Sequence, residues 1–277
     1  MSFEKVEIGT ATLYHGDAFD ILPTLEDDSI HCVASDFPYG ITNHTWDQVP
    51  PLDLTWRLLE AKSKDNANYV LFGAGGFTID LINSKRDWFR YSMAWVKNNK
   101  TGHLNAGLMP MRNKEDIIVF GKPGHQKTAV FNVPDGFPQP SDVLVCPHER
   151  GNNQQGKNYH VTQKPVLLMG HLLLMYSNPG DLILDSFMGS GSTGVAAMKL
   201  GRRFVGIEKD EKFFSTACQR LEEIWQRKTA RRLTYLSLSS NQPNADSTAT
   251  EEESAIPVAP EAEHQNRETP KPTEELQ

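Results

Sequence analysis

The glycine-rich run Asp185-Ser186-Phe187-Met188-Gly189-Ser190-Gly191-Ser192-Thr193-Gly194 constrains the fold more than any other stretch. It follows the apolar residues 182–184, which are typical of a buried strand, and precedes residues 195–200, which have helical spacing. Glycines permit a tight turn and leave the backbone open to a ligand, while the N–H groups of the helix start point at that ligand. The run therefore predicts a strand, a turn and a helix that hold a nucleoside-type cofactor at the carboxyl edge of a parallel sheet.

An acidic residue supports this interpretation. Glu208 follows the apolar segment 204–207, and a carboxylate at a second strand end can accept hydrogen bonds from both hydroxyls of a ribose. The pattern G-x-G-x-x-G at residues 189–194 fits NAD as well as other nucleotides, so these residues do not identify the cofactor.

Apolar runs and helical spacing alternate along the rest of the chain, which favours an α/β fold with a mostly parallel sheet and helices on both faces. Strands are expected at 4–8, 11–14, 30–35, 69–72, 90–96 and 116–120, and helices at 52–64, 78–84, 165–176 and 211–227.

Composition divides the chain into parts. Residues 121–160 contain five prolines, five glycines and four asparagines, which predicts an inserted, loop-rich variable region. Residues 237–277 are polar, with nine acids and two bases, and are typical of a disordered tail. This tail accounts for the net charge of −7, so a neutral domain is predicted over residues 1–236.

The three cysteines form no CxxC pair, and the histidines lack metal-ligand spacing, so no disulfide framework and no metal site are predicted. The N-terminus shows no signal-peptide core, and no apolar run reaches about 18 residues. A soluble, cytoplasmic protein without a membrane partner is expected.

A second motif, Asp36-Phe37-Pro38-Tyr39, follows the strand expected at 30–35. Pro38 restricts Phe37 to extended geometry, which would direct the Asp36 carboxylate and the Phe37 carbonyl together as two acceptors for one NH₂ group. Tyr39 offers a flat face for a planar ring. The alternative is a plain proline turn with Tyr39 in the core.

The two motifs together resemble a known family. Residues 36–39 are similar to the (Asp/Asn/Ser)-Pro-Pro-(Tyr/Phe/Trp) motif of amino-group methyltransferases, and residues 185–194 resemble their S-adenosylmethionine loop. Thr162-Gln163-Lys164-Pro165 resembles a third block. The order, with the catalytic motif before the cofactor loop, is that of β-class DNA methyltransferases, and the resemblance extends over residues 12–225.

This resemblance implies a Rossmann-like S-adenosylmethionine-dependent fold, with the catalytic residues Asp36, Phe37, Pro38 and Tyr39. It places Asp17 at the adenine edge of the cofactor, where the alternative is a helix N-cap, and Lys164 near its ribose or carboxylate, where the alternative is a solvated lysine. The implied cofactor-binding residues are Asp17, Ala18, Asp36, Lys164, Asp185, Phe187, Gly189, Ser190, Gly191, Ser192, Thr193 and Glu208.

Phe37 stands where the family usually has proline. The acceptor required there is a backbone carbonyl, which any residue supplies, so methyl transfer is expected to survive.

The implied substrate is double-stranded DNA with a flipped-out base, in a restriction-modification setting, and a homodimer is a further expectation. Aspartate at the first motif position resembles the adenine-N6 enzymes and is less typical of the cytosine-N4 enzymes. DNA contacts are expected from the irregular segments 41–50, 97–114 and 121–160.

Other functions stay open on the residues alone. An NAD-dependent oxidoreductase explains the glycine run and Glu208 but not residues 36–39. A catalytically silent nucleic-acid binder is suggested by Phe37. An RNA methyltransferase is a further alternative, whereas the motif order disfavours the protein-glutamine enzymes.

Overall fold

The computed structural model describes residues 3–41, 47–103, 106–125, 127–133, 139–147 and 163–240, with side chains up to residue 230. The chain divides into two compact units, Met1–Tyr235 and Leu236–Gln277. Thr162, much of the 121–160 region and residues 241–277 lie outside the described residues. None of the helices in the described part is long and apolar enough to cross a membrane.

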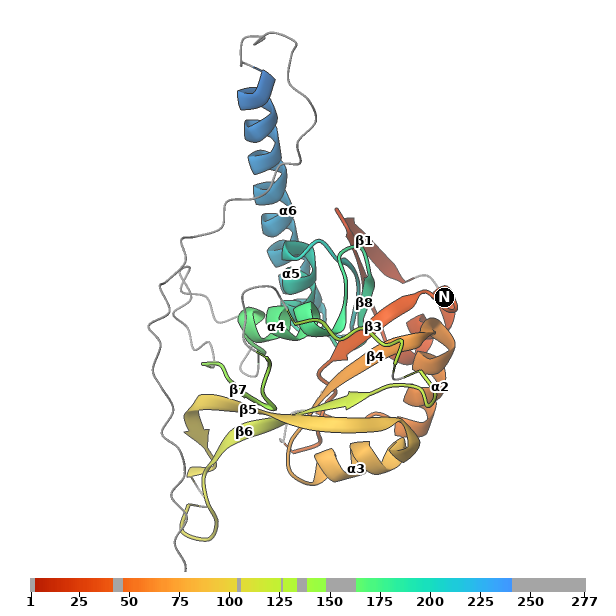
Figure 1. The fold of residues 1–277 in the computed structure, drawn as a ribbon, viewed down its shortest axis with the longest axis vertical. Coiled ribbons are helices and arrows are strands. Elements are labelled where there is room, and N and C mark those ends of the chain that lie inside the picture. The colour runs from red at the N-terminus through yellow and green to blue at the C-terminus, as the bar shows by residue number, and fades with distance from the viewer. Residues whose placement is uncertain are drawn as a thin grey trace, which may run out of the picture. The chain divides into compact units, whose positions relative to one another are not determined.

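Among the described residues, nine strands form one sheet in the order β1-β2-β9-β8-β3-β4-β6-β5-β7 (Figure 1). The central strands β2, β9, β8, β3 and β4 are mutually parallel, whereas β1 and β6 pair antiparallel with their neighbours β2 and β4. The mostly parallel sheet is thus confirmed. The strands are β1 Glu4–Ile8, β2 Ala11–His15, β3 Ile30–Ser35, β4 Ser63–Gly73, β5 Phe89–Thr101, β6 Arg112–Phe120, β7 Val143–Val145, β8 Leu182–Asp185 and β9 Arg203–Glu208.

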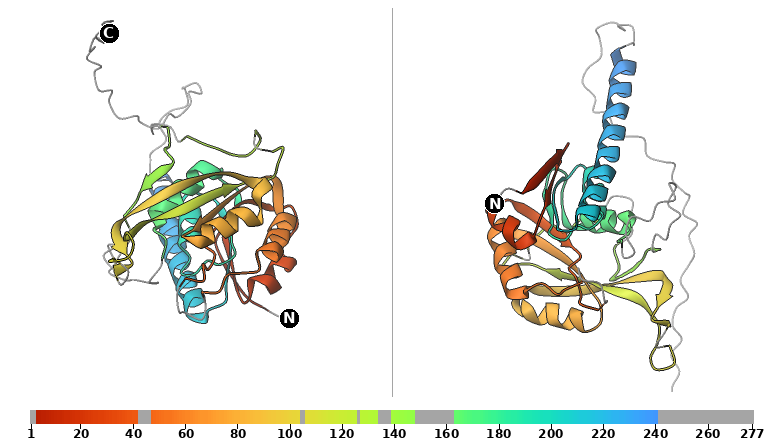
Figure 2. Two further views of the ribbon diagram at one scale, coloured as in Figure 1. Left: turned by 90° about the horizontal axis from the view of Figure 1, so that it is seen from below. Right: turned by 180° about the vertical axis from the view of Figure 1, so that it is seen from behind.

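Helices cover both faces of the sheet (Figures 1 and 2). One face packs against α1, α2 and α3, and the other against α4, α5 and the first part of α6. The helices are α1 Ala18–Ile21, α2 Leu52–Lys62, α3 Gly76–Ser84, α4 Val166–Tyr176, α5 Ser192–Lys199 and α6 Glu211–Ser240, with short 3₁₀ turns η1 Leu22–Thr24 and η2 Arg86–Trp88.

The two cores follow from the alternation of side chains along each buried strand. In β4, Val70 and Phe72 point into the core beneath α4 and α5, while Tyr69 and Leu71 point into the core beneath α2 and α3. Because both faces are covered, the strands are apolar at consecutive positions.

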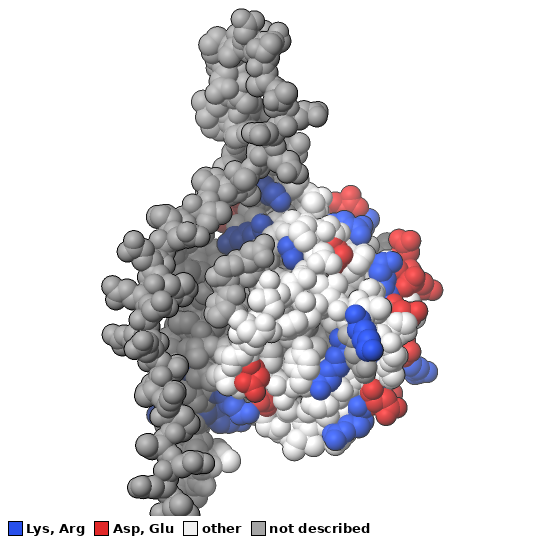
Figure 3. Space-filling model, in the orientation of Figure 1, with Lys and Arg blue, Asp and Glu red and all other residues white. Residues whose placement is uncertain are grey.

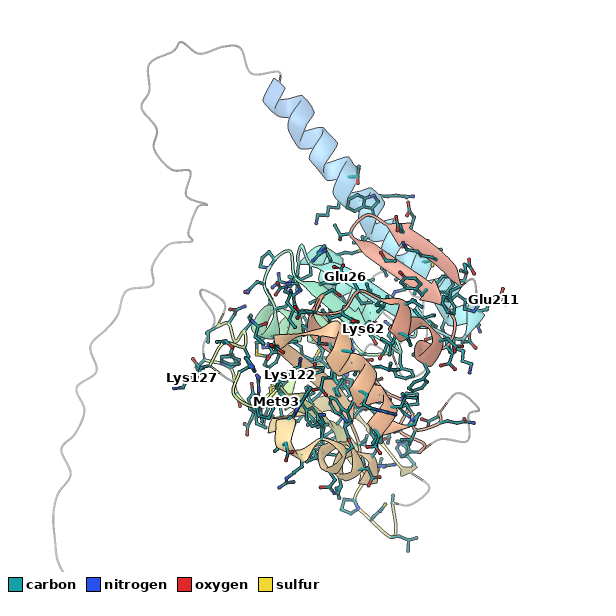
Figure 4. All side chains as sticks on the ribbon, turned by 90° about the vertical axis from the view of Figure 1, so that its right-hand side faces the viewer. Glu26, Lys62, Met93, Lys122, Lys127 and Glu211 are labelled. Carbon is teal, nitrogen blue, oxygen red and sulfur yellow. The ribbon has the colours of Figure 1, made fainter. Side chains whose placement is uncertain are left out.

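A buried lysine fixes the end of α2. The ammonium of Lys62, labelled in Figure 4, donates to the carbonyls of Pro23 (3.0 Å) and Leu25 (2.8 Å) and pairs with the Asp27 carboxylate at 2.5 Å. It thereby holds the segment between η1 and β3 against the helix that precedes β4.

Three parts of the fold differ most from those expected. The strand expected at 69–72 is β4, which begins at Ser63, so the last two residues of the helix expected over 52–64 are in a strand. Residues 97–101 and 112–114, predicted to be irregular, belong to β5 and β6, which extend the hairpin beyond the sheet. The last helix, predicted to end near Arg227, continues to Ser240, so the first residues of the predicted disordered tail are helical. No glycine or proline occurs from Glu211 until Pro243, so no residue type in that stretch ends the helix earlier.

Candidate active site

A cavity of about 620 Å³ lies at the carboxyl edge of the parallel strands. Parallel strands end at the same edge, so the residues that follow β2, β3, β8 and β9 converge there. With one exception, every predicted site residue lines the cavity: Asp17, Ala18, Asp36, Phe37, Pro38, Tyr39, Lys164, Asp185, Phe187, Gly189, Ser190, Ser192, Thr193 and Glu208.

The exception is Gly191, which the structure uses for packing. Its φ is +77°, and a Cβ at this position would lie 2.9 Å from the Cβ of Ala217 in α6. Glycine is required here by a left-handed backbone and a close helix approach.

The Asp36 carboxylate has a partner on each oxygen. The Tyr39 hydroxyl donates to Oδ1 at 2.6 Å, and the Lys164 ammonium contacts Oδ2. Burial raises the pKa of the Asp36 carboxyl, against the lowering by Lys164. The Tyr39 ring stacks on Phe77, with centroids 5.2 Å apart and planes 25° apart.

Lys164 points toward the methyl-acceptor motif. Its ammonium pairs with Asp36, lies 3.2 Å from Glu115 Oε2, and sits 4.9 Å from the centroid of the Phe72 ring. Glu115 also pairs with Lys97 of β5. The described contacts of Lys164 are therefore with Asp36, its neighbours and aromatic rings, rather than with the glycine-rich turn.

A carboxylate that the sequence did not single out organises the loop after Pro38. Asp47 Oδ1 accepts the backbone N–H groups of Tyr39 and Gly40, both at 2.8 Å, and Oδ2 accepts that of Ile41 at 3.0 Å. Asp47 is buried, at 7% exposed. Three consecutive N–H groups on one carboxylate hold the backbone of this loop in one conformation.

Glu208 bridges the glycine-rich turn and the residues after β9. Its Oε2 accepts the N–H of Gly189 and its Oε1 the N–H of Asp210, each at 2.8 Å. Burial raises the pKa of the Glu208 carboxyl, while these backbone donors lower it.

Asp17 is the N-cap of α1, which was the alternative interpretation of this residue. Its Oδ1 accepts the N–H of Phe19 at 2.9 Å, and its Oδ2 pairs with Lys209 at the same distance. Burial acts to raise the pKa of Asp17, but Lys209 and the Phe19 N–H outweigh it and hold the pKa below its usual value. The residue still lines the cavity.

Asp185 ties three elements together beneath the cavity. Its carboxylate accepts the hydroxyls of Ser35 (2.7 Å) and Thr193 (2.6 Å) and the N–H of Phe187 (3.2 Å). Burial raises the pKa of Asp185 to about 6, although these hydrogen bonds lower it. The residue thereby joins β3, β8 and α5.

The serines of the turn also have protein partners. Ser190 Oγ lies 3.2 Å from Gln163 Oε1, and Arg220 of α6 donates to Ser190 and, at 3.4 Å, to Ser192 Oγ. Arg220 is buried, and it was not predicted because it lies about 30 residues from the turn on an otherwise ordinary amphipathic helix.

The comparison with known families decides the assignment. A family model described as DNA methylase, of the N6/N4 type, matches residues 30–219, which is more than half of the chain. The chain belongs to this DNA methylase family. Its substrate is therefore DNA, as the resemblance implied.

Individual relatives agree with this assignment. The Type II methyltransferase M.HinfI of Haemophilus influenzae is 40% identical over 259 residues, covering 81% of this chain and 72% of the relative. The Type II methyltransferase M1.MboII of Moraxella bovis is 26% identical over 247 residues, covering 74% and 94%.

Solved structures confirm the Rossmann-like methyltransferase fold. The M1.HpyAVI–SAM complex is 28% identical to this DNA methylase, with a TM-score of 0.57, and covers 76% of this chain and 98% of its own. The cytosine-N4-specific PvuII DNA methyltransferase is 17% identical, with a TM-score of 0.66 and coverages of 82% and 96%, and shares the fold.

Proposed function

We propose that this DNA methylase transfers a methyl group from S-adenosylmethionine to the exocyclic N6 amino group of adenine in double-stranded DNA. The observation that carries the proposal is a single cavity lined by both the Asp36–Tyr39 loop and the glycine-rich turn with Glu208. Direct transfer requires an amino-group site and a nucleoside site within reach of each other. The likeness to the M1.HpyAVI–SAM complex supports the choice of cofactor.

The donor side of the cavity fits this cofactor. Each Glu208 oxygen accepts one N–H and retains capacity for a ribose hydroxyl. A Cβ at Gly189 would meet no atom within 4 Å, so its backbone is open to a ligand. Ala18 and Phe187 supply apolar surface and Asp17 a carboxylate for the adenine end. When bound, S-adenosylmethionine supplies an electrophilic methyl group on a sulfonium sulfur, which keeps the electron pair of the broken carbon–sulfur bond.

On the acceptor side, the Asp36 carboxylate and the Phe37 carbonyl accept the two hydrogens of the amino group. The amino nitrogen gains positive charge as it bonds to the methyl carbon. The Asp36 carboxylate stabilises that charge and then accepts the proton that the nitrogen loses. Tyr39, braced by Phe77, holds the plane of the flipped base. Flipping costs the duplex a few kcal/mol.

The β5–β6 hairpin is the element best placed to contact the duplex. β6 begins, and β5 ends, on the sheet edge that holds the cavity, because β6 runs antiparallel to β4. The hairpin carries the exposed bases Lys100 and Arg112, which suit phosphate contacts. On the face drawn in Figure 3, the described basic and acidic side chains are interspersed.

We propose a cytoplasmic location, which is consistent with a DNA methylase. A homodimer is proposed on the family resemblance alone, and light scattering of the purified chain tests it.

The test is long-read detection of modified bases in DNA from cells that express the chain or its Asp36→Ala variant. We expect N6-methyladenine at one short recognition sequence, absent with the variant. Detection of N4-methylcytosine alone would show that the target base is cytosine and not adenine. DNA without any methylated base would instead favour a nucleic-acid binder that has no catalytic activity. Thermal stabilisation by NAD and not by S-adenosylmethionine would instead support an oxidoreductase.

A further inference from the structure

A line of alternating charges runs from the hairpin to the acceptor motif. Lys97 of β5 pairs with Glu115 Oε1 in β6, Glu115 Oε2 lies 3.2 Å from the Lys164 ammonium, and Lys164 pairs with Asp36 Oδ2. The side chains of Glu115 and Lys164 are only 15% and 8% exposed. Three parts of the chain that are distant in sequence thus meet at two carboxylates that share one buried lysine.

In this arrangement each oxygen of Asp36 already has one donor. Tyr39 donates to its Oδ1 and Lys164 to its Oδ2, yet the proposed reaction needs one of these oxygens to accept a hydrogen from the amino group. An amino group that binds Asp36 competes with these donors for the negative charge of the carboxylate, so the new hydrogen bond is stronger when one of them withdraws. Lys164 is the donor with another carboxylate beside it.

Glu115 can accept a hydrogen bond from Lys164 through its oxygen Oε2. Its Oε2 is buried and makes no well-formed hydrogen bond among the described residues, although the Lys164 ammonium is 3.2 Å away. The other neighbours of the ammonium are the rings of Phe72, Tyr39 and Trp95, at 4.9, 5.6 and 6.0 Å to their centroids, and the Tyr39 hydroxyl at 3.5 Å. A cation in such a place needs a carboxylate partner, because an unpaired buried charge is strongly unfavourable.

We propose that Glu115 is a positioning residue: it takes over the Lys164 ammonium when Asp36 Oδ2 accepts the amino group of the target base. Lys97 holds the opposite oxygen of Glu115, so the carboxylate stays in place while the lysine shifts. This inference rests on the proposed function. With a neutral side chain at position 115, Lys164 keeps Asp36 as its one charged partner and competes with the amino group.

The experiment compares Glu115→Gln with the full-length wild-type chain in methyl transfer to DNA. We expect kcat to fall at least tenfold, while the Kd for S-adenosylmethionine alone, measured by calorimetry, and the KM for DNA stay within twofold. In a Lys164→Met background the same change should alter kcat less than twofold, because the competing ammonium is gone. Glu60→Gln on α2, which breaks a 3.2 Å pair with Lys85, is the control and should leave kcat unchanged.

Two results would overturn the inference. The first is a kcat of Glu115→Gln within twofold of wild type. The second is a double variant whose fold loss of kcat equals the product of the losses in Glu115→Gln and Lys164→Met. Should Glu115→Gln fail to fold, Lys97→Met removes the cation on the far side of Glu115, and we expect the same loss of kcat; an unchanged kcat then overturns the inference. A wild-type chain that methylates no DNA defeats the proposed function itself, and this appears without any substitution.

Discussion

At the scale of single residues, Asp185 stands apart because the partners of its carboxylate among the described residues carry no positive charge. Hydroxyls and one backbone N–H are its partners, and burial raises its pKa to about 6. An acid whose pKa is raised in the folded state adds stability below its unfolded pKa of about 3.8, and that stability is lost as the pH rises toward 6. At pH 7 the buried charge therefore lowers the free energy of unfolding by about 2 kcal/mol relative to pH 4.

We predict that Asp185→Asn removes this part of the pH dependence. The difference in unfolding free energy between variant and wild type should shift by about 2 kcal/mol in favour of the variant between pH 4 and pH 7. Urea denaturation at the two pH values measures it. Asp80→Asn on the exposed surface of α3 is the control, and an equal shift in both variants would contradict the prediction.

Phe37, which departs from the proline of the family motif, is packed inside the fold. Its side chain is 2% exposed and packs edge-on against Phe187, with centroids 5.3 Å apart. The ring thus joins the loop after β3 to the glycine-rich turn. The sequence predicted the carbonyl's role from Pro38, but the packing of the ring depends on a residue 150 positions away and had no local signal.

At the scale of elements, the loop from Asp36 to Ile41 owes its conformation to Asp47. Asparagine has one acceptor oxygen, so it would leave at least one of the three N–H groups facing an amide NH₂. A backbone N–H that loses its acceptor costs about 1–3 kcal/mol where water cannot reach it, and the loop would move to avoid this cost.

We predict that Asp47→Asn lowers kcat for methyl transfer by about tenfold or more, since a small misplacement of catalytic groups is enough to do so. The Kd for S-adenosylmethionine should stay within about twofold, because the glycine-rich turn is untouched. Steady-state kinetics and calorimetry measure the two quantities. Asp53→Asn, six positions on and exposed, serves as the control. A variant that loses cofactor affinity and kcat in parallel would speak against a local effect on the loop.

The elements that build the site were largely predictable, because apolar runs followed by glycine or acidic residues mark strand ends. The extension of β5 and β6 was not, since Lys97, Asn98, Asn99 and Lys100 are polar and show no alternation. Asp47, Glu115 and Arg220 also escaped prediction. Glu115 and Arg220 have partners in other parts of the fold, and Asp47 binds backbone N–H groups six to eight positions away. Spacing along the chain carries no sign of such contacts.

At the scale of the whole molecule, charge is distributed unevenly along the chain. Of the 28 bases and 35 acids, 26 of each lie in residues 1–236, so this part has no net charge. The remaining two bases and nine acids lie in residues 237–277. We expect a segment with a net charge of −7 to repel DNA and to compete with it for basic side chains. It should weaken non-specific DNA binding most at low salt.

We predict that a chain ended after Ser240, where α6 ends, binds non-specific duplex DNA more tightly at low salt and shows a steeper dependence of affinity on salt. Methyl transfer at saturating DNA should be unchanged. Fluorescence anisotropy over a salt series measures the slope for both chains. Identical slopes would show that the acidic segment has no part in DNA binding.

The pairing of β3 with β8 has a consequence for the synthesis of the chain. It matches Cys32 with Ile183, residues about 150 positions apart, and so brings the amino-group loop beside the cofactor turn. Contacts this distant in sequence form late, because the intervening chain must be ordered first. A ribosome-bound chain therefore carries the loop of residues 36–41 long before β8 and β9 emerge, and we expect it to gain activity only after both strands have been made. Fragments from premature termination would be unable to modify DNA in the cell.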